Sequence, residues 1–372
     1  MEISLPFIVF AVYLLCFFIQ LYYILFVHLR LSRYKVKNGT EETRHPVSVI
    51  ICGRNEEENF RNNLPLILEQ DYPDFEVVVV NDCSSDDTEW VLKEYSEKYP
   101  RLKIVTIKEH ERFKHGKKFA VTLGIKAASN ECLLFTDADC RPASSKWLER
   151  MQHHFDERTE IVLGYSPYKK TGGFVNTLIR TETFYTALNY LSYALKRNPY
   201  MGVGRNMAYK KSLFFRNKGF ASHMHIPSGD DDLFVNQNAS RTNTAIEIHP
   251  DSHIWSEPES TLSAYTKQKL RHFGAGKAYK KRHQLMLSIQ AGSAILFYIL
   301  LAVLCGMQFF LWAVLAVYLL RLIAQLSVYY PVLKKLSAGD LVFFLPAFDL
   351  IYYFYILVVN AIRLFKKKVQ WR

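Results

Sequence analysis

The sequence predicts an α/β domain that is flanked at both ends by membrane-spanning helices. Residues 5–27 contain no charged side chain, and the chain is again largely apolar from about residue 285 onward. Between these parts, residues 46–135 alternate between β-branched runs and helical patterns. The 49% hydrophobic content is therefore an average over two unlike parts, which excludes a simple soluble protein and an intrinsically disordered one.

The formal net charge of +12 is concentrated beside the apolar runs. Three stretches without any acid hold sixteen of the 47 Lys and Arg residues, and the other 31 are outnumbered by 35 Asp and Glu. Basic flanks beside long apolar runs are typical of the cytoplasmic ends of membrane helices. This distribution predicts contact with membrane lipid and argues against a nucleic-acid partner. The three stretches are residues 28–37, 267–283 and 363–372.

Residues 1–28 are predicted to form an N-terminal transmembrane anchor. At 1.5 Å per residue, the 23 residues of the uncharged run are long enough to cross a hydrocarbon core of about 30 Å. A cleaved signal peptide is the alternative, but residues 1–4 carry no base and no small-x-small cleavage site follows the run. Four bases follow within residues 30–37, which orients the N-terminus outside and the next domain in the cytoplasm.

Residues 276–372 are predicted to hold an interfacial segment and three further apolar runs, of which the first two form a hairpin. The third contains Pro346 and Asp349. Three complete spans would put the lysines at 366–368 outside, whereas a re-entrant or interfacial third segment would keep them inside. The sequence leaves both arrangements open. The runs cover residues 286–306, 309–329 and 341–363.

Residues 40–275 are predicted to form one cytoplasmic domain whose first half alternates strands and helices. Near-continuous apolar strands between helices indicate a sheet that is covered by helices on both faces. In such sheets a ligand binds beyond the carboxyl ends of the strands. The expected strands are residues 46–52, 75–80, 102–107 and 132–135, and the expected helices are 59–70, 86–99 and 117–129.

Acidic and polar side chains follow three of these strands. They are RNEE at 54–57, NDCSSDD at 81–87 and TDAD at 136–139. The sequence has neither a GxGxxG fingerprint nor a P-loop, so a nucleotide diphosphate bound here would need a divalent cation. Asp137 and Asp139 lie two residues apart at a strand end and can point into one pocket. Their carboxylates are the hard oxygen ligands that Mg²⁺ and Mn²⁺ prefer.

The cysteines and histidines receive no catalytic role. The six cysteines form no CxxC pair and are interpreted as small buried hydrophobic residues. The histidines lack the spacing of metal ligands.

Six short segments recur in a characteristic order along the soluble domain. They are VSVIICGRNEE at 47–57, VNDCSS at 80–85, TDAD at 136–139, GRNM at 204–207, GDDDL at 229–233 and QKLR at 268–271. Together they resemble the family 2 glycosyltransferases, which are inverting enzymes that use nucleotide sugars. The resemblance implies a GT-A domain, a Rossmann-like mixed sheet with helices on both faces, joined to transmembrane helices.

The resemblance assigns several residues to the donor. Asp82 would hydrogen-bond the nucleotide base, although this chain has asparagine before it where the family often has a second aspartate. Glu56 would also bind substrate. Asp139 would be the main metal ligand, and Asp137 would face either the ribose or the metal. Lys117 or the adjacent Lys118, at the start of an expected helix, would contact the phosphates.

Asp231 aligns with the family's catalytic base. Inversion by direct displacement needs one carboxylate to take the proton of the acceptor hydroxyl during attack at the anomeric carbon. Three adjacent aspartates repel one another, which should raise the pKa of at least one. The spacing before Leu233 is one residue shorter than the commonest family pattern, so Asp230 and Asp232 remain alternatives for the base.

Further residues are assigned to the acceptor side. Gln268 and Arg271 resemble the QxxRW motif, which implies contact with the diphosphate and the acceptor near the membrane. His272 stands where processive polymer synthases have tryptophan, which argues against processivity; the same basic helix can also lie on anionic lipid. Asn206 would belong to an acceptor-side loop. Residues 174–200, rich in Tyr and Phe, either line an acceptor groove or pack in the core.

These features predict a multi-pass integral protein of the inner or cell membrane with a cytoplasmic catalytic domain. Its expected reaction moves a sugar from a UDP- or GDP-linked donor, with Mg²⁺ or Mn²⁺, to a lipid-linked or saccharide acceptor in envelope polysaccharide or glycolipid synthesis. A processive synthase of the cellulose, chitin or poly-N-acetylglucosamine type is the alternative within this class. A non-catalytic membrane partner that binds sugar nucleotides is the alternative of another class.

Overall fold

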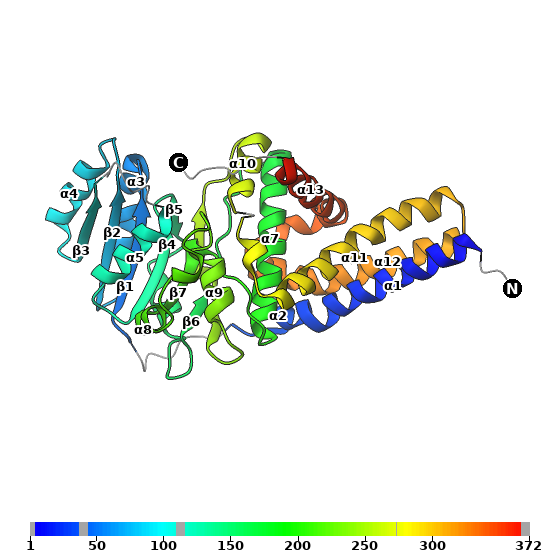
Figure 1. Ribbon diagram of the computed structural model, residues 1–372, viewed down its shortest axis with the longest axis horizontal. Coiled ribbons are helices and arrows are strands. Elements are labelled where there is room, and N and C mark those ends of the chain that lie inside the picture. The colour runs from blue at the N-terminus through cyan, green and yellow to red at the C-terminus, as the bar shows by residue number, and fades with distance from the viewer. Residues whose placement is uncertain (1–3, 37–43, 109–115, 273, 366–372) are drawn as a thin grey trace.

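The protein is elongated, with an α/β domain at one end and a bundle of long helices at the other (Figure 1). A computed structural model describes residues 4–36, 44–108, 116–272 and 274–365; for residues 271, 272 and 363–365 it describes the backbone only. Helix α7 (Gly173–Leu195) stands between the two parts. The expected order of helical ends around an α/β domain is confirmed.

The α/β domain is built on a mixed sheet. Its strands are β1 (Val47–Gly53), β2 (Phe75–Asp82), β3 (Leu102–Ile107), β4 (Cys132–Asp137), β6 (Ile161–Leu163), β7 (Met207–Lys210) and β8 (Thr244–Ile246). They lie in the order β3-β2-β1-β4-β7-β6-β8. β1 to β4 are parallel, and β7 runs antiparallel to β4 and β6. A small second sheet pairs β5 (Cys140–Pro142) with β9 (Ile254–Ser256).

Helices cover both faces of the sheet, as expected. Because successive strand residues point to opposite faces, Val49 and Ile51 of β1 meet α3 (Glu57–Leu68) and α4 (Thr88–Lys98) in one core. Ile50 points the other way, toward α5 (Lys117–Ala127). There a Cβ on Gly124 would lie 2.8 Å from Ile50 Cγ2, so α5 packs closely on the sheet. These strand and helix bounds agree with the expected ones to within two residues.

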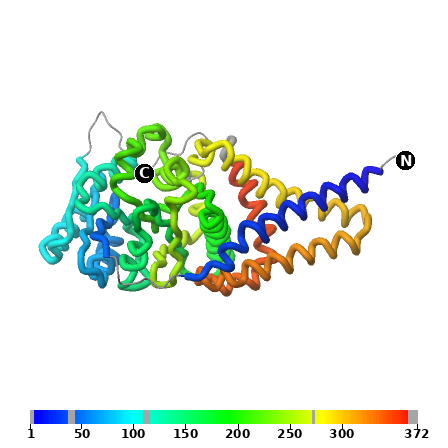
Figure 2. The backbone as a smooth tube through the Cα atoms, turned by 90° about the horizontal axis from the view of Figure 1, so that it is seen from below, coloured from blue at the N-terminus to red at the C-terminus, as the bar shows by residue number. Residues whose placement is uncertain are grey.

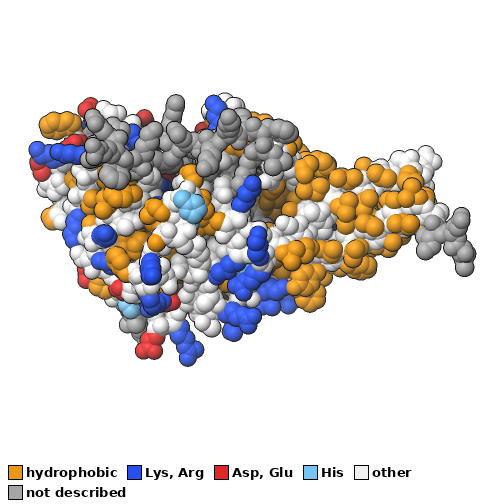
Figure 3. Space-filling model, viewed as in Figure 1, with side chains coloured by type: hydrophobic (Ala, Val, Ile, Leu, Met, Phe, Trp, Pro, Cys, Tyr) orange, Lys and Arg blue, Asp and Glu red, His pale blue; other side chains and the backbone are white. Residues whose placement is uncertain are grey.

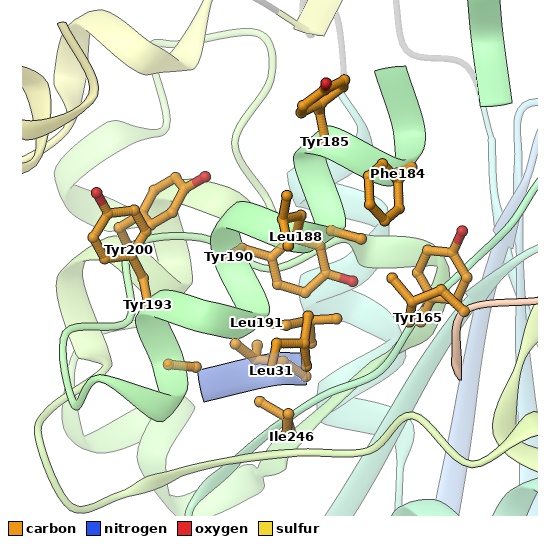
Figure 4. Close-up of a cluster of buried hydrophobic side chains, with 14 of the residues drawn as sticks. Leu31, Tyr165, Phe184, Tyr185, Leu188, Tyr190, Leu191, Tyr193, Tyr200 and Ile246 are labelled. Atoms are coloured by element: carbon orange, nitrogen blue, oxygen red, sulfur yellow. The ribbon is translucent and has the colours of Figure 1, made fainter. Parts of the chain in front are cut away.

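The second half of the domain contains shorter elements around the long helix α7. Four tyrosines in or just after α7 are buried: Tyr185, Tyr190, Tyr193 and Tyr200. Figure 4 shows α7 side chains meeting Leu31 from the N-terminal helix and Ile246 from β8. Most of residues 174–200 thus form core between the sheet and the bundle, whereas Phe174 is 54% exposed. The shorter helices are α6 (Trp147–Gln152), η2 (Gly204–Asn206), α8 (Lys211–Arg216), η3 (Ala221–His223), α9 (Asp232–Asn238), η4 (Pro250–Ser252), α10 (Leu262–His272) and η5 (Ala275–Ala278).

The bundle begins with one continuous helix over residues 5–33, made of α1 (Leu5–Tyr22), the π-helical η1 (Tyr23–His28) and α2 (Leu29–Arg33). It packs against α11 (Lys281–Gly306) and α12 (Leu311–Lys335). Gln20 of α1 donates from Nε2 to Ser293 Oγ of α11 at 2.6 Å. The helix over residues 5–33, α11 and α12 each extend beyond the expected apolar run at the end that carries Lys and Arg. A helix can continue into such a polar flank outside the hydrocarbon core.

Among the described residues, four helices are long and apolar enough to cross a membrane: the three of the bundle and α13 (Leu345–Phe365). Figure 3 shows hydrophobic side chains over the projecting bundle, with Lys and Arg gathered where it joins the α/β domain. That distribution is typical of membrane helices with basic flanks.

Helix α13 does not run along the bundle. After the short η6 (Gly339–Phe343) it packs on α7 and α11, and in both views it crosses the long helices at a steep angle (Figures 1 and 2). This orientation favours the re-entrant or interfacial arrangement of the third run over a fourth parallel span. The lysines at 366–368, on which the sequence argument depended, lie outside the described residues.

A buried ion pair joins α12 to α13. Arg321 Nη2 lies 2.9 Å from Asp349 Oδ2, and the two side chains are 2% and 1% exposed. Gln325 Nε2 donates to Asp349 Oδ1 at 2.7 Å, and the hydroxyls of Tyr185 and Tyr298 also donate to this carboxylate. The charge is therefore held by groups from α7, α11, α12 and α13 together.

Candidate functional site

The carboxyl ends of β1, β2 and β4 meet at one edge of the sheet, and hydrogen bonds join the loops that follow β1 and β2. Asn55 has a φ of 58°, a left-handed conformation that asparagine tolerates better than most residues. Its amide N–H donates to Ser84 Oγ at 2.9 Å, and its Oδ1 accepts from the Ser85 N–H at 2.8 Å. Asp82, at the end of β2, is 2% exposed beside this junction.

Lys117 links two of the predicted acidic residues. Its Nζ lies 2.8 Å from Asp137 Oδ1 and 3.6 Å from Asp230 Oδ2. Although burial opposes it, the carboxylates of Asp137 and Asp230 hold the pKa of Lys117 well above its usual range, so this ammonium stays charged. Residues from α5, from β4 and from the 229–233 segment therefore meet at Lys117.

Asp139 follows β4 on the exposed side of the edge. Loss of hydration and the neighbouring Asp137 carboxylate raise its pKa. One ligand atom each from Asp137, Asp139 and Cys140 can be chosen so that all lie within 4.8 Å of one another. Because two of the three groups are carboxylates at an open edge, this donor set fits Mg²⁺ or Mn²⁺ completed by phosphate oxygens.

Cys140 and the polar groups that contact it lie beside Asp139. Cys140 Sγ donates to Asp139 Oδ1 at 3.2 Å and lies 3.1 Å from Ser256 Oγ on β9. Arg205 donates from Nη1 to the same Ser256 hydroxyl at 2.8 Å, and its guanidinium stacks over Tyr168 at 4.4 Å from the ring centroid. Arg205 is a cation beside the acidic edge; it belongs to the GRNM segment, in which only Asn206 was assigned a role from the sequence.

Glu56 faces the same edge from the start of α3. Its Oε2 accepts from Asn59 Nδ2 at 2.6 Å. Burial raises the pKa of Glu56, and the charges of Asp139 and Asp137 raise it further, against the lowering effect of the Asn59 hydrogen bond. The Glu56 carboxylate thus lies near enough to interact with the charges of Asp137 and Asp139, which were assigned to the donor with it.

Asp231 is the N-cap of α9 and is held by two backbone donors. Its Oδ2 accepts from the Gly204 N–H at 2.8 Å, and its Oδ1 from the Asp232 N–H at 2.7 Å. Burial and the charge of Asp230 raise the pKa of Asp231 to about 6. The expectation that repulsion among these aspartates would raise a pKa is met.

Asp232 turns away from this point and accepts from the Tyr279 hydroxyl at 2.8 Å. Burial and the charge of Asp231 raise the pKa of Asp232 to about 8, so it is partly protonated near neutral pH. A group that is mostly protonated at pH 7 and held by Tyr279 is a weaker base candidate than Asp231 or Asp230. A cavity of about 20 Å³, large enough for one water molecule, lies between Lys117, Asp230 and Asp231.

Asn206, predicted to line the acceptor side, is fully buried. Trp147 Nε1 donates to its Oδ1 at 3.0 Å, and its Nδ2 donates to the carbonyls of Tyr165 at 2.7 Å and Ser252 at 2.8 Å. All its amide hydrogen bonds are thus made inside the protein. In this structure Asn206 fixes the loop that carries Arg205 and does not face a substrate.

We expect Gly164→Ala to lower the free energy of unfolding by about 1–3 kcal/mol, the usual cost of overpacking. A Cβ at this position would lie 2.5 Å from Asn206 Cγ, so the hydrogen-bonded amide would have to move. Denaturant titration of the purified protein measures the change. Gly276→Ala is the matched control because a Cβ there meets nothing within 4 Å. Equal stability of the two variants would contradict the role of Asn206 as a fixed support.

The QKLR segment lies on α10, at the height of the same sheet edge, against α13 (Figure 1). Gln268 is half-buried. The side chains of Arg271 and His272 lie outside the described part of the chain. On the same helix Lys269 lies 2.6 Å from Glu182 Oε2 of α7, which anchors α10 beside the bundle.

Comparison with known proteins gives a family and a fold. Residues 48–216 match the model of the family described as glycosyl transferase family 2. The glycosyltransferase AglE of Haloferax volcanii is 38% identical over 106 residues, 28% of this chain and 33% of AglE. The probable glycosyltransferase YdaM of Bacillus subtilis is 34% identical over 131 residues, 35% of this chain and 28% of YdaM. The chain thus matches about a third of the length of these curated relatives.

One solved structure resembles nearly the whole chain. The mannosyltransferase PcManGT from Pyrobaculum calidifontis, in complex with GDP-Man and Mn²⁺, superposes with a TM-score of 0.59 over 95% of this chain and 99% of that one. At 18% identity this likeness shows a shared fold. The GT-A architecture expected from the sequence is confirmed.

Proposed function

We propose that this chain, whose residues 48–216 match the model of glycosyl transferase family 2, is a membrane-bound inverting enzyme of that family. It would move a sugar from a nucleotide-diphosphate donor to a lipid-linked or saccharide acceptor in envelope polysaccharide or glycolipid synthesis. The observation that carries this proposal is the convergence of Asp137, Lys117 and Asp230 within 3.6 Å at the carboxyl edge of the sheet, directly beside Asp231.

The donor would lie along the edge between Asp82 and Asp139. Asp82 would hydrogen-bond the base, and Glu56 would support the donor from the start of α3. Asp139 and Asp137 would hold Mg²⁺ or Mn²⁺, which would neutralise charge on the leaving diphosphate. Lys117 keeps its positive charge at this point and would add to that neutralisation. The complex of PcManGT with GDP-Man and Mn²⁺ supports a nucleotide-sugar donor and a divalent ion.

Asp231 would act as the base. The acceptor hydroxyl oxygen would form a bond to the anomeric carbon on the face opposite the diphosphate, whose bond to that carbon breaks. The hydroxyl proton would pass to the Asp231 carboxylate. The Gly204 N–H, 2.8 Å from Asp231 Oδ2, would fix the orientation of this carboxylate. Asp230 stays the alternative base, because its carboxylate faces the same cavity.

The acceptor would approach from the membrane side of the domain. The Lys and Arg side chains at the junction of bundle and domain would rest on anionic lipid headgroups (Figure 3). Gln268 and Arg271 on α10 would contact the diphosphate and the acceptor. This arrangement would orient the catalytic domain toward the cytoplasm at the inner or cell membrane.

Two other functions remain as rivals. A processive polysaccharide synthase would release long polymers, and His272 in place of the expected tryptophan argues for single transfers. A non-catalytic partner would bind sugar nucleotides without turnover, but it would not need an oriented carboxylate such as Asp231. A donor screen on purified membranes, following release of UDP or GDP with and without Mn²⁺, tests the proposed function. Nucleotide binding without release from any donor would favour the non-catalytic partner.

We expect Asp139→Asn to weaken donor binding and to remove its dependence on a divalent ion. The loss of one carboxylate lowers the affinity of the oxygen site for Mg²⁺ or Mn²⁺. Nucleotide binding measured by isothermal titration before and after EDTA should fall at least tenfold in the wild type and change little in the variant. Asp71→Asn, at an exposed pair with Lys146, is the control. Wild-type binding that survives EDTA unchanged would remove the metal role of Asp139.

A further inference from the structure

We propose that His153, His154 and Glu247 form a second metal site, built for Zn²⁺, outside the acidic edge of the sheet. The two histidines directly follow α6, and Glu247 directly follows β8. Glu247 lies more than ninety positions after the two histidines in the sequence, so no local spacing of residues reveals the cluster.

The ligand atoms already face one another. His154 Nε2 lies 2.8 Å and His153 Nδ1 3.9 Å from Glu247 Oε2. One ligand atom from each of the three residues can be chosen so that all lie within 4.8 Å of one another. Tetrahedral zinc with bonds of about 2.0–2.1 Å places its ligands about 3.3 Å apart. Changes of up to about 1.5 Å in these separations would bring the three protein ligands to that spacing, and a water molecule would supply the fourth ligand, as in zinc sites made of two histidines and a glutamate.

His153 is a buried polar side chain whose position is otherwise unexplained. Only 9% of the side chain is exposed, and its ring stacks on that of His154 with the centroids 3.9 Å apart. The Arg150 carbonyl lies near the ring, but neither ring nitrogen makes a hydrogen bond within the described residues. Such burial costs stability unless another group satisfies the nitrogen. A cation between the two rings and Glu247 would do so.

Glu247 is oriented as metal-binding carboxylates are. Its Oε1 accepts from the His249 N–H and, at 3.2 Å, from Ser252 Oγ. These bonds leave Oε2 directed at the two imidazoles. Hydrogen bonds of this kind, from groups that do not touch the metal, fix the orientation of metal ligands and are a regular part of metal sites.

The surrounding charges allow a cation. Arg150 is the nearby positive group, and its Nη2 lies 3.8 Å from the carboxylate of Asp251, which offsets it. His249 also lies beside Asp251, with Nδ1 3.3 Å from Oδ2.

The donor set distinguishes this site from the acidic edge. Two imidazoles and one carboxylate suit Zn²⁺, whereas the carboxylates of Asp137 and Asp139 suit Mg²⁺ or Mn²⁺. A bound Zn²⁺ would clamp the end of α6 to the segment after β8. That segment carries the Ser252 carbonyl, which accepts from Asn206, so the clamp would also brace the loop of Arg205.

Zinc binding by the full-length protein in detergent tests the proposal. After removal of metals with a chelator, Zn²⁺ is titrated in competition with a chromophoric chelator, and Co²⁺ is added separately to record the absorption bands of tetrahedral cobalt. The variants are His153→Asn, Glu247→Gln and Asp139→Asn, with His225→Asn as an exposed histidine control. Thermal unfolding in the absence of metal shows whether each variant is folded.

We expect one Zn²⁺ per chain, tetrahedral Co²⁺ bands, and affinity at least about 100-fold weaker in the His153 and Glu247 variants, beyond the usual cost of losing an outer-shell partner. The Asp139 and His225 variants should bind Zn²⁺ as the wild type does. Equal Zn²⁺ affinity in the wild type and His153→Asn would overturn the proposal, as would loss of the bound zinc only in Asp139→Asn. None of these outcomes depends on whether the protein transfers a sugar.

Discussion

Asp231→Asn should lower the turnover number of sugar transfer by about 10²–10⁴-fold, the usual contribution of a general base. Asparagine keeps the size of the side chain but cannot take the proton of the acceptor hydroxyl. Donor binding should remain within a few-fold of the wild type, because Asp231 lies beside the donor edge and is not among the groups proposed to hold the donor. Initial rates with a saturating donor, together with nucleotide titration, measure the two effects separately.

Two further variants sharpen this result. Asp71→Asn, an exposed acid paired with Lys146, should keep the turnover number within about twofold, as surface substitutions usually do. Asp230→Asn distinguishes the two base candidates, since Asp230 faces Lys117 whereas Asp231 is fixed by backbone N–H groups. If Asp231→Asn retains wild-type turnover while Asp230→Asn loses it, the base is Asp230.

The raised pKa of Asp231 predicts how activity depends on pH. A base must be ionised, so kcat/KM should rise with pH up to about 6, the pKa of Asp231, and then level off. The stability contribution has the opposite sign. Because the folded-state pKa exceeds the unfolded value of about 3.9, this group stabilises the fold at low pH, and that contribution is lost as the pH rises through about 6. The ionised, active form is thus the less stable one.

Breaking the Arg321–Asp349 pair should destabilise the protein by about 3–5 kcal/mol, because removal of one partner leaves a buried charge uncompensated. Either Arg321→Met or Asp349→Asn should therefore lower the thermal midpoint by roughly 6–10 °C. Thermal unfolding in detergent, followed by intrinsic fluorescence or light scattering, measures the shift. Ser327→Ala, at an exposed position on α12, is the control and should change little.

The double variant Arg321→Met with Asp349→Asn provides the decisive comparison. With both charges removed, neither is left unpaired, so the loss should be smaller than the sum of the two single losses. Tyr185 and Gln325, which both donate to Asp349 Oδ1, would keep an acceptor where the asparagine carbonyl takes that position, whereas Tyr298 would then face the amide nitrogen. Strictly additive losses would show that the two charges do not stabilise each other in the folded bundle.

The sequence predicted the first half of the α/β domain because its elements are local. β1 to β4 are six to eight residues long, apolar and separated by clear helices, so each is visible within its own segment. β6 and β8 have only three residues each; β6 pairs with β7 on one side and with β8 on the other. Strands of that length have no period to detect, and their position depends on contacts that are distant in the sequence.

In the candidate site, too, some positions could be predicted from a local segment and others depend on contacts between distant segments. The positions of Asp82 and Asp137 at strand ends, and of Asp139 two residues beyond β4, could be predicted because parallel strands end at one edge of a sheet. The link from Lys117 to both Asp137 and Asp230 depends on how α5 and α9 pack, which the sequence does not record. For Asn206 the motif suggested a place on the acceptor side, but the structure shows its side-chain amide hydrogen-bonded only to groups inside the protein.

The hydrogen bond from Gln20 to Ser293 joins residues 273 positions apart, and this has a consequence for biosynthesis. At about 5–20 residues per second, Ser293 leaves the ribosome roughly 15–55 s after Gln20. During that interval the first helix has to wait in the lipid with a polar amide that has no helical neighbour, while the water-soluble domain folds on its tether. Insertion therefore demands either a holding site for the nascent helix or a late entry into the bilayer together with its two partners.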